Sequence, residues 1–400
     1  HHQSWDMFPR YRTLEAARKL AELFGAKLKI KTNLPSLDLT DNFVLAAKHN
    51  LTHAPEIIDM RTEIKQGNFS IFSRALREAI AKKIDQKQSI VLFINRRGTA
   101  NFVLCRDCGH INQCLNCEAP LAYHVIAGQP TLWCHACRLK SPLPELCPKC
   151  QSWRIKTVGA GTQRVEAEAK KSFPKTSIFR LDSDATPRFQ DQEKIIRAFN
   201  QDSPSILVAT QAILGWKDAL KPALIGILAI DSLFNLPDFH AGERTWQTIF
   251  FFDRLLYKSG QLLIQTYNPE NHLLQSMAKN DFLNFSREEL LDRQNLDYPP
   301  FSQIIKLSFR LRDPQRAERE AKILAAKLQQ ANKDDTISIS SATPAWRPKE
   351  KGFFIWQIII KQKIADNNSK ISPAFLARRN QLLQYVPSSW HVEVDPENLL

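Results

Sequence analysis

The sequence lacks any apolar run of the roughly 18–20 residues that a membrane-spanning helix needs. One partly apolar stretch, LFNLPDFHAGERTWQTIFFF, is interrupted by charged residues and a proline. The first residues, HHQSWDMFPRYR, contain no apolar segment of a signal peptide. We therefore expect a cytoplasmic protein without a membrane partner. The sequence also does not begin with Met, which is consistent with a fragment of a longer chain.

Acidic residues are scarce relative to basic ones. There are 41 Asp and Glu against 55 Lys and Arg, which gives a formal charge of +14. A basic excess favours binding to polyanions, most often nucleic acid, and so a location at the nucleoid. A charge that only keeps the protein in solution explains the composition equally well. The length of 400 residues suffices for about two or three domains.

Cysteine is also rare, and all 8 cysteines fall between Cys105 and Cys150. They form four C-x-x-C pairs, in each of which two thiolates on one tight turn can reach the same metal ion. A reducing compartment disfavours disulfides between them. We predict two tetrahedral Zn²⁺ sites of four cysteines each, because no thiol is then left over. An iron–sulfur cluster is the weaker alternative.

The segment between the second and third pairs predicts how the pairs combine. LAYHVIA and TLW are predicted strands and GQP a turn, which makes a hairpin that brings these two pairs together as in a zinc ribbon. The outer pairs are then left for the other zinc. One predicted site is therefore formed by Cys105, Cys108, Cys147 and Cys150, and the other by Cys114, Cys117, Cys134 and Cys137. Neither has an open coordination position, so both are expected to be structural.

Strand and helix patterns alternate on both sides of the cysteine-rich segment. SIVLFIN precedes it, and the predicted strands IKTV, TSIFRLD, SILVAT, LIGILAID and QLLIQT follow it, with helical segments between them. This alternation predicts a mainly parallel sheet wrapped by helices, and so an α/β protein with the cysteine-rich segment inserted.

After Ser302 the pattern changes to strand, helix, two strands, helix and strand, the order of an α+β split-βαβ domain. The prolines of DYPPF mark the boundary before it. At the other end, a helix over TLEAARKLAELFG and a strand over AKLKIKT are predicted as the trailing end of another α/β lobe. The predicted domains are 1–40 for that trailing end, 41–98 with 154–301 for the α/β lobe, 99–153 for the two-zinc insertion and 302–400 for the C-terminal domain.

Several stretches of the sequence carry a resemblance to a known protein family. They are PRYRTLEAARKLAE, EIIDMRTEIKQGNFSIFSRALREAI, VLFINRRGTANFVLCRDCGH, GAGTQRVEAE, LPDFHAGERTWQ, IQTYNPENHLLQ, YPPF and VDPENLL. Together they resemble the PriA family of primosomal replication-restart helicases (primosomal protein N′) over nearly the whole chain. The predicted two-zinc insertion lies where this family has it, between NRRG and GAGTQ.

The resemblance implies the second RecA-like lobe of a DNA helicase, with an inserted zinc ribbon module and a C-terminal α+β domain. It implies forked or single-stranded DNA, primosome proteins, the replicative helicase loader and single-stranded-DNA-binding protein as partners. The family's P-loop and D-E-x-H box lie in a first lobe, and His1 aligns with the last residue of that box. We therefore expect most of that lobe to be missing here. No G-x-x-x-x-G-K-[ST] occurs in the sequence, so ATP and Mg²⁺ are expected only beside an intact first lobe.

Three family motifs are altered in this chain. In place of Q-V-A-G-R-A-G-R it has FFFDRLLYKSG, with Leu255 and Lys258 at the arginine positions and Arg254 one residue out of register. Such arginines stabilise charge on a transferred phosphoryl group, so their loss predicts a much slower motor. S-A-T-P is replaced by TNLP (Thr32–Pro35), and G-T-Q-M-x-x-K-G by ATQAILGW (Ala209–Trp216).

Three short segments supply candidate DNA contacts. NRRG follows a strand end, where open α/β sheets present ligands, although a surface ion pair is an equal alternative. Two residues persist from the family motif that faces the single strand, with capping of the strand SILVAT as the alternative. WRPKEKGFFIW interleaves cations with aromatic residues, most of which are expected to fill the C-terminal core. The candidates are Arg96, Arg97, Thr210, Gln211, Lys349 and Lys351.

The sequence thus predicts a protein that binds stalled or forked DNA and promotes primosome assembly and helicase reloading, without helicase activity of its own. The alternative is an active ATP-dependent 3′–5′ DNA helicase whose first lobe is missing from this chain. A generic zinc-ribbon nucleic-acid binder is a further alternative. Enzymatic activity, oligomeric state and fork preference are left open by the sequence.

Overall fold

The computed structural model describes residues 13–29, 36–37, 51–95, 101–105, 110, 112, 114–115, 121–126, 129–134, 139–158, 161–182, 186–234, 236, 238–364 and 372–399. The chain divides into two compact units, residues 1–35 and 36–400. In the first unit, α1 (Thr13–Leu23) lies where a helix is predicted. Residues 26–29 of the strand predicted over AKLKIKT have no regular structure, and the rest of that segment is outside the described residues.

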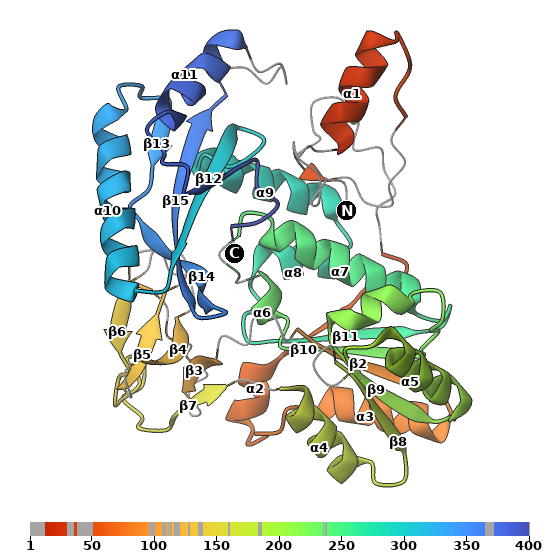
Figure 1. Cartoon of the computed structure of the whole chain (residues 1–400). Coiled ribbons are helices and arrows are strands. Elements are labelled where there is room, and N and C mark those ends of the chain that lie inside the picture. Colours follow the sequence, from red (N-terminus) through yellow and green to blue (C-terminus); the bar gives the residue numbers. More distant parts are fainter. Residues whose placement is uncertain are drawn as a thin grey trace. The chain divides into compact units, whose positions relative to one another are not determined.

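The second unit contains a parallel sheet of six strands in the order β1-β11-β10-β2-β9-β8 (Figure 1). Every neighbouring pair in it is parallel. Its elements in chain order are β1 (Glu56–Asp59), α2 (Met60–Lys65), α3 (Arg74–Asp85), β2 (Ile90–Ile94), α4 (Thr162–Ser172), β8 (Ser177–Leu181), α5 (Phe189–Gln201), β9 (Ser205–Ala209), the 3₁₀ helix η3 (Gln211–Trp216), β10 (Leu224–Leu228), α6 (Asp231–Phe234), α7 (Ala241–Leu255), β11 (Gln261–Thr266), α8 (His272–Ala278) and α9 (Phe282–Asn295).

The central strands are buried along their whole length because both faces of the sheet are covered, and Ser205 is their one polar residue. Every residue of β2, β9 and β10 is buried. On one face, Leu76 of α3 and Val165 of α4 pack against the strands. On the other face, the ring of Phe93 lies 4.6 Å from that of Phe252 in α7. Gly226 of β10 permits the close approach of α3, since a Cβ there would meet Leu76 Cδ1 at 2.8 Å. The predicted α/β class with a parallel sheet is confirmed.

A second sheet, of five antiparallel strands, interrupts this domain between β2 and α4. Its order is β6-β5-β4-β3-β7. The strands are β3 (Asn101–Cys105), β4 (Ala122–Ile126), β5 (Gln129–Trp133), β6 (Lys140–Pro142) and β7 (Ile155–Val158). The β4–β5 hairpin is the one predicted between the second and third cysteine pairs.

The position predicted for IKTV is wrong. This strand, β7, was expected in the parallel sheet, but it pairs antiparallel with β3, with Ile155 opposite Cys105. Its strand pattern does not distinguish the two sheets, because four residues carry no information about their partner strand.

The C-terminal part is an α+β domain with the sheet order β13-β15-β12-β16 and β14 added beside β15. Its elements are β12 (Ser302–Leu311), α10 (Pro314–Ala331), β13 (Ile337–Ile339), β14 (Thr343–Glu350), β15 (Phe353–Lys363), α11 (Pro373–Leu383) and β16 (His391–Val394). Asp313 and Ser372 cap the two helices, each of which begins at a proline as the sequence indicates. The helices pack on one face of the sheet, where Leu324 and Leu382 meet Ile358.

Strand β14 was not predicted. It contains Pro344 and Pro348, which argue against a central strand but are tolerated in one that pairs on a single side. Among the described residues, no helix combines the length and apolarity needed to span a bilayer.

Candidate metal centre and nucleic-acid interface

Three of the four cysteine pairs begin in the same backbone arrangement. The N–H groups of Cys105, Cys134 and Cys147 each donate to the carbonyl of the residue five positions later, at 2.9, 2.8 and 2.8 Å. Each bond joins the first cysteine of a pair to the residue two positions beyond the second cysteine. The backbone therefore holds the first cysteine of each of these three pairs in place.

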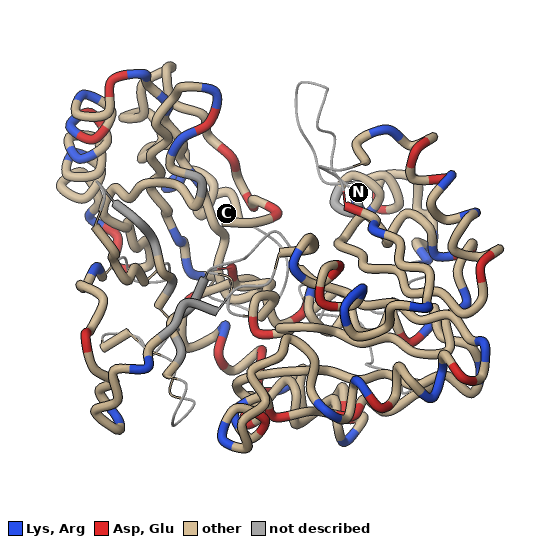
Figure 2. The backbone as a smooth tube through the Cα atoms, turned by 90° about the horizontal axis from the view of Figure 1, so that it is seen from below, with Lys and Arg blue, Asp and Glu red and all other residues tan. Residues whose placement is uncertain are grey.

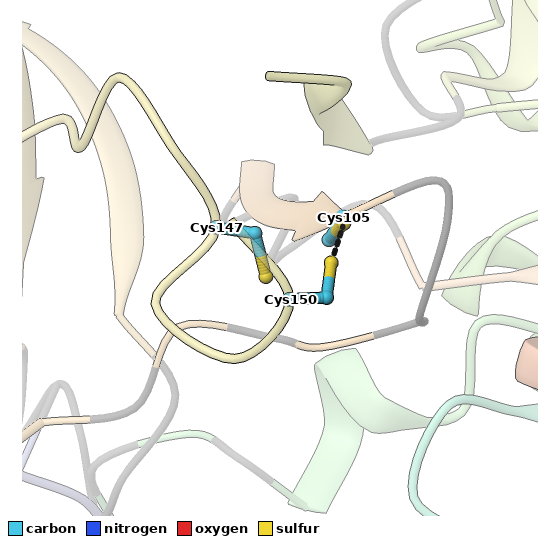
Figure 3. Close-up of side chains that lie close together, drawn as sticks. All are labelled: Cys105, Cys147 and Cys150. Carbon is cyan, nitrogen blue, oxygen red and sulfur yellow. Dashed lines mark hydrogen bonds between the residues drawn. The ribbon is translucent and has the colours of Figure 1, made fainter. Parts of the chain in front are cut away.

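The structure brings together thiols of the first and fourth pairs (Figure 3). The sulfur atoms of Cys105, Cys147 and Cys150 lie within 4.8 Å of one another, with 3.6 Å between those of Cys105 and Cys150. In a tetrahedral zinc site with Zn–S bonds of about 2.3 Å, neighbouring sulfur atoms are about 3.8 Å apart, so this spacing suits zinc. It is far longer than a disulfide bond of about 2.05 Å. The fourth predicted ligand, Cys108, is outside the described residues.

Strand register explains why these distant cysteines meet. Cys105 ends β3, and its partner across the ladder is Ile155 at the start of β7. The turn of Cys147 and Cys150 comes just before β7, so the β3–β7 ladder carries that turn to the end of β3. The antiparallel pairing of β3 with β7 thus brings these cysteines together although they lie far apart in the sequence.

Two thiols of the other predicted site are described, Cys114 and Cys134. Both are buried, and both belong to one small apolar cluster with Val103, Leu121 and Leu132. The β4–β5 hairpin separates them in sequence. Cys117 and Cys137 lie outside the described residues, so the structure describes two of the four predicted ligands of this site.

Two of the predicted contacts, Thr210 and Gln211, lie at the carboxyl edge of the parallel sheet. Arg96 and Arg97 are outside the described residues, directly after Asn95. Thr210 is 4% exposed and its N–H donates to the carbonyl of Leu181, which favours the strand-capping alternative. Gln211 is half-buried, and its Nε2 donates to Asn95 Oδ1 at 3.4 Å. Gln211 thus lies beside the start of NRRG.

A cluster of cations and aromatic rings surrounds the turn between β14 and β15. Lys349 and Lys351 are exposed there, and Lys349 Nζ lies 5.1 Å from the ring centre of Phe354. Arg310 of β12 and Arg312, just after that strand, lie 5.6 and 5.3 Å from the ring centre of Phe353. We call Arg310, Arg312, Lys349, Lys351 and Phe353 the hairpin patch. Over the rest of the chain, basic and acidic positions intermingle (Figure 2).

Sequence reasoning missed the two arginines of this patch. They stand in SFRLRD, far from WRPKEKGFFIW along the chain, and only the β12–β15 register brings Arg310 opposite Ile355. The alternation of cations in FRLR was an available signal, because residues two apart on a strand share a face.

The altered arginine motif maps to the end of α7. Leu255 is 1% exposed and is a core residue, whereas Lys258 is exposed beyond the helix. Arg254 is exposed in the last turn, with its guanidinium 5.2 Å from the ring centre of Phe250. The segment ATQAILGW forms the end of β9 and η3, where Trp216 stacks on Phe189 at 4.7 Å. Thr32–Pro35 lies outside the described residues.

Two buried carboxylates at the carboxyl edge of the sheet were also missed. Asp182 accepts a hydrogen bond from Thr162 Oγ1 at 2.7 Å, and Asp231 accepts one from Thr266 Oγ1 at 2.9 Å. Burial raises the pKa of Asp231 to about 6. Each is the last residue of a predicted strand, TSIFRLD or LIGILAID, which is the signal that could have marked them.

Comparison with known proteins gives a consistent result. Residues 294–397 match the family "Primosomal protein N C-terminal domain". The chain is 31% identical to the replication restart protein PriA of Synechocystis over 413 residues, which covers 98% of this chain and 48% of the relative. It is 33% identical to that of Bacillus subtilis over 369 residues, 89% of this chain and 45% of the relative. The chain thus spans about half the length of the curated relatives it matches.

Proposed function

We propose that this chain, whose resemblance to the PriA family is confirmed by these similarities, acts in the restart of DNA replication. Within that role it binds stalled or forked DNA and promotes primosome assembly and helicase reloading, without helicase activity of its own. The observation that carries this proposal is a contrast between two sites. Three predicted zinc ligands converge at the end of β3, whereas a motor arginine position holds the buried Leu255.

The metal centre is proposed to hold zinc in two structural sites. Cys105, Cys147 and Cys150, with Cys108, would hold one ion, and the set containing Cys114 and Cys134 the other. Bound zinc supplies folding free energy to the five-stranded sheet, because closed thiolate sites have no room for a reacting water. Metal analysis of the purified chain is expected to give two zinc ions per chain. Cys150→Ser should lower that number to one, while Ser152→Ala on the same turn should not change it.

The DNA interface is proposed to combine the hairpin patch with the region of Gln211, Arg96 and Arg97. Cations set over aromatic rings suit a single strand, because the cations pair with phosphates while the rings stack with bases. The primosome proteins, the replicative helicase loader and single-stranded-DNA-binding protein are proposed as protein partners, in the cytoplasm at the nucleoid. ATP and Mg²⁺ belong to the proposal only where an intact first lobe stands beside this chain.

The second candidate is an active ATP-dependent 3′–5′ helicase that includes this chain. The parallel sheet favours it. The resemblance implies a RecA-like architecture, and in this chain the strands β2, β9 and β10 of the sheet are fully buried. DNA-stimulated ATP hydrolysis by the complete gene product separates the candidates. Turnover at ordinary helicase rates would contradict the proposed loss of motor function.

The decisive test of the proposal is binding of the chain to forked, single-stranded and duplex DNA over a series of salt concentrations. A restart protein is expected to prefer the fork at every salt concentration. Binding through phosphate contacts alone would instead weaken for all three DNAs as the salt concentration rises. Equal affinity for forks and plain single strands would instead favour the generic zinc-ribbon binder.

A further inference from the structure

Two aromatic rings stack at the carboxyl edge of the parallel sheet. The ring of Phe189, the first residue of α5, lies 4.7 Å from that of Trp216, the last residue of η3, with an angle of 17° between the ring planes. We call these two residues the aromatic pair. They belong to the elements that follow β8 and β9, which are neighbours in the sheet. Open α/β sheets present their ligands at this edge, so the aromatic pair lies where a ligand binds in such folds.

The ring of Phe189 has one covered face and one open face. Trp216 covers the first, and Phe189 is nevertheless 66% exposed. A single exposed apolar side chain is ordinary on a protein surface. A flat ring that is already stacked on one side and open on the other is more specific, because a second planar group can extend the stack.

Hydrogen bonds hold Trp216 beneath this ring. Its Nε1 donates to Gln192 Oε1 at 3.2 Å, and Gln192 Nε2 donates to the carbonyl of Thr186 at 2.9 Å. The N–H and Oγ1 of Thr186 both donate to the carbonyl of Asp182, which directly follows β8. The indole is thus tied to the end of a strand. A planar ligand would meet an ordered surface, so little of its binding free energy would be spent on ordering side chains.

The charges that flank the aromatic pair cancel. Arg188 and Lys217, each next to one of the rings along the chain, are exposed cations. Asp191 and Asp218, each two residues from one of the rings, offset them. The open face therefore offers a flat apolar surface without an excess of either charge. Such a surface suits the face of a nucleobase better than it suits a phosphate or a charged peptide.

We propose that one base of a DNA single strand stacks on the open face of Phe189. The proposal rests on the proposed binding of DNA, and it adds a base contact beside Gln211, which lies in the same 3₁₀ helix five residues before Trp216. Every base has a π face, so the contact accepts any sequence. The family motif that corresponds to ATQAILGW ends in glycine, so the ring of Trp216 that supports this site is a feature of the present chain.

The test measures binding of the full 400-residue chain to two forked DNAs by fluorescence anisotropy. One fork has a single-stranded arm of thymidines, and the other has an arm of abasic sugar–phosphate units with the same phosphates. Phe189→Ala should weaken binding of the thymidine fork roughly 5- to 100-fold, as expected for the loss of one stacked base, and leave binding of the abasic fork unchanged. Phe189→Trp should bind the thymidine fork as tightly as the wild type, because it keeps a flat ring.

The salt dependence separates stacking from charge. Phe189→Ala removes no cation, so the slope of log affinity against log salt should equal that of the wild type. Because Phe189 is mostly exposed, this variant is also expected to unfold close to the wild-type temperature.

Tyr257→Ala is the matched control. Tyr257 is 54% exposed, and its N–H donates to the carbonyl of Pro222, just before β10, so it lies at the amino edge of the same sheet. This variant removes an exposed ring of similar size from the opposite edge. It should bind both forks as the wild type does.

The outcomes distinguish this inference from the proposed function. Equal weakening of both forks by Phe189→Ala would overturn the inference, because the ring would then not contact a base. Unchanged binding of both forks would also overturn it and would leave an apolar segment of a protein partner as the occupant of the open face. A wild type without fork preference but with the Phe189 effect would contradict the proposed function and leave the stacking site standing. Fork preference without a Phe189 effect would do the reverse.

Discussion

Arg293 is a buried cation of the α/β domain that binds two carboxylates. It is 2% exposed and bonds to Glu243 and Glu289, and burial raises the pKa of Glu289 although Arg293 opposes that effect. Arg293→Met is expected to lower the free energy of unfolding by about 3–5 kcal/mol, because two buried carboxylates lose their cation. Urea denaturation measures this change. Arg287→Met, at an exposed position of the same helix, should change it by no more than about 0.5 kcal/mol.

Gly242 adds a second constraint on this cluster. A Cβ at this position would meet Glu289 Oε2 at 2.5 Å. The glycine therefore lets α7 and α9 approach closely enough for the ion pairs to form. Stability of Gly242→Ala equal to that of the wild type would show that Glu289 can move away without loss.

Asp231 predicts a pH dependence of stability. Burial raises its pKa from 3.8 to about 6, so between these values the unfolded chain releases a proton that the folded chain retains. Stability therefore falls as pH rises from about 4 to 6, by about 3 kcal/mol from this group. Asp231→Asn should remove that decrease, so the variant gains stability relative to the wild type across this interval.

The comparison requires denaturation curves of both proteins at several pH values. Asp202→Asn, which removes an exposed carboxylate, is the control for a change in net charge. A wild type and Asp231→Asn variant whose stabilities change in parallel with pH would contradict the assignment.

At the scale of elements, sequence patterns predicted the strands that are buried on both faces. β2 and β10 are continuous apolar runs and β9 is apolar after Ser205, and short runs of this kind are typical of strands in a parallel sheet that helices cover on both sides. β14 escaped prediction because its two prolines and its cations lower its apparent strand propensity. β7 was found but assigned to the wrong sheet, because its partner β3 is specified by tertiary pairing and not by its own residues.

The candidate site, like the strands, could be predicted from the sequence only in part. The strand and turn pattern between the inner cysteine pairs predicted which pairs meet, since that hairpin is encoded locally. The arginines of the hairpin patch were not predictable, because Arg310 and Arg312 meet Phe353 only through the β12–β15 ladder. Leu255 could be identified as a departure from the family motif, but its burial needed the packing of α7.

The hairpin patch predicts a measurable change in the salt dependence of DNA binding. Lys349→Ala with Lys351→Ala is expected to weaken binding and to reduce the slope of log affinity against log salt by about 1.4, because each phosphate contact to a single strand contributes about 0.7. Arg319→Ala with Lys322→Ala on α10 removes the same charge from the helix-covered side of the domain. An equal reduction for both double variants would mean that only net charge matters.

At the scale of the whole molecule, removal of metal should destabilise the five-stranded sheet and leave the parallel sheet folded. The strand pairs of the five-stranded sheet lie within residues 101–158, beside the cysteines, whereas the parallel sheet contains no cysteine. A zinc chelator is therefore expected to abolish hydrogen-exchange protection in β3 to β7 and to preserve it in β2, β9 and β10. Simultaneous loss in both sheets would show that they unfold as one cooperative unit.

The interleaving of the two sheets along the chain has a consequence for synthesis on the ribosome. β3 to β7 complete their ladders within one contiguous stretch, whereas Glu56 of β1 pairs with Leu263 of β11, and β2 pairs with the later strands β9 and β10. Because translation delivers the chain from its N-terminus, the five-stranded sheet with its proposed zinc sites can fold while the parallel sheet still has no partners for β1 and β2. β1 and β2 therefore remain unpaired while the insertion is already folded. Because unpaired strand edges promote aggregation, the nascent chain is more exposed to aggregation than the finished protein.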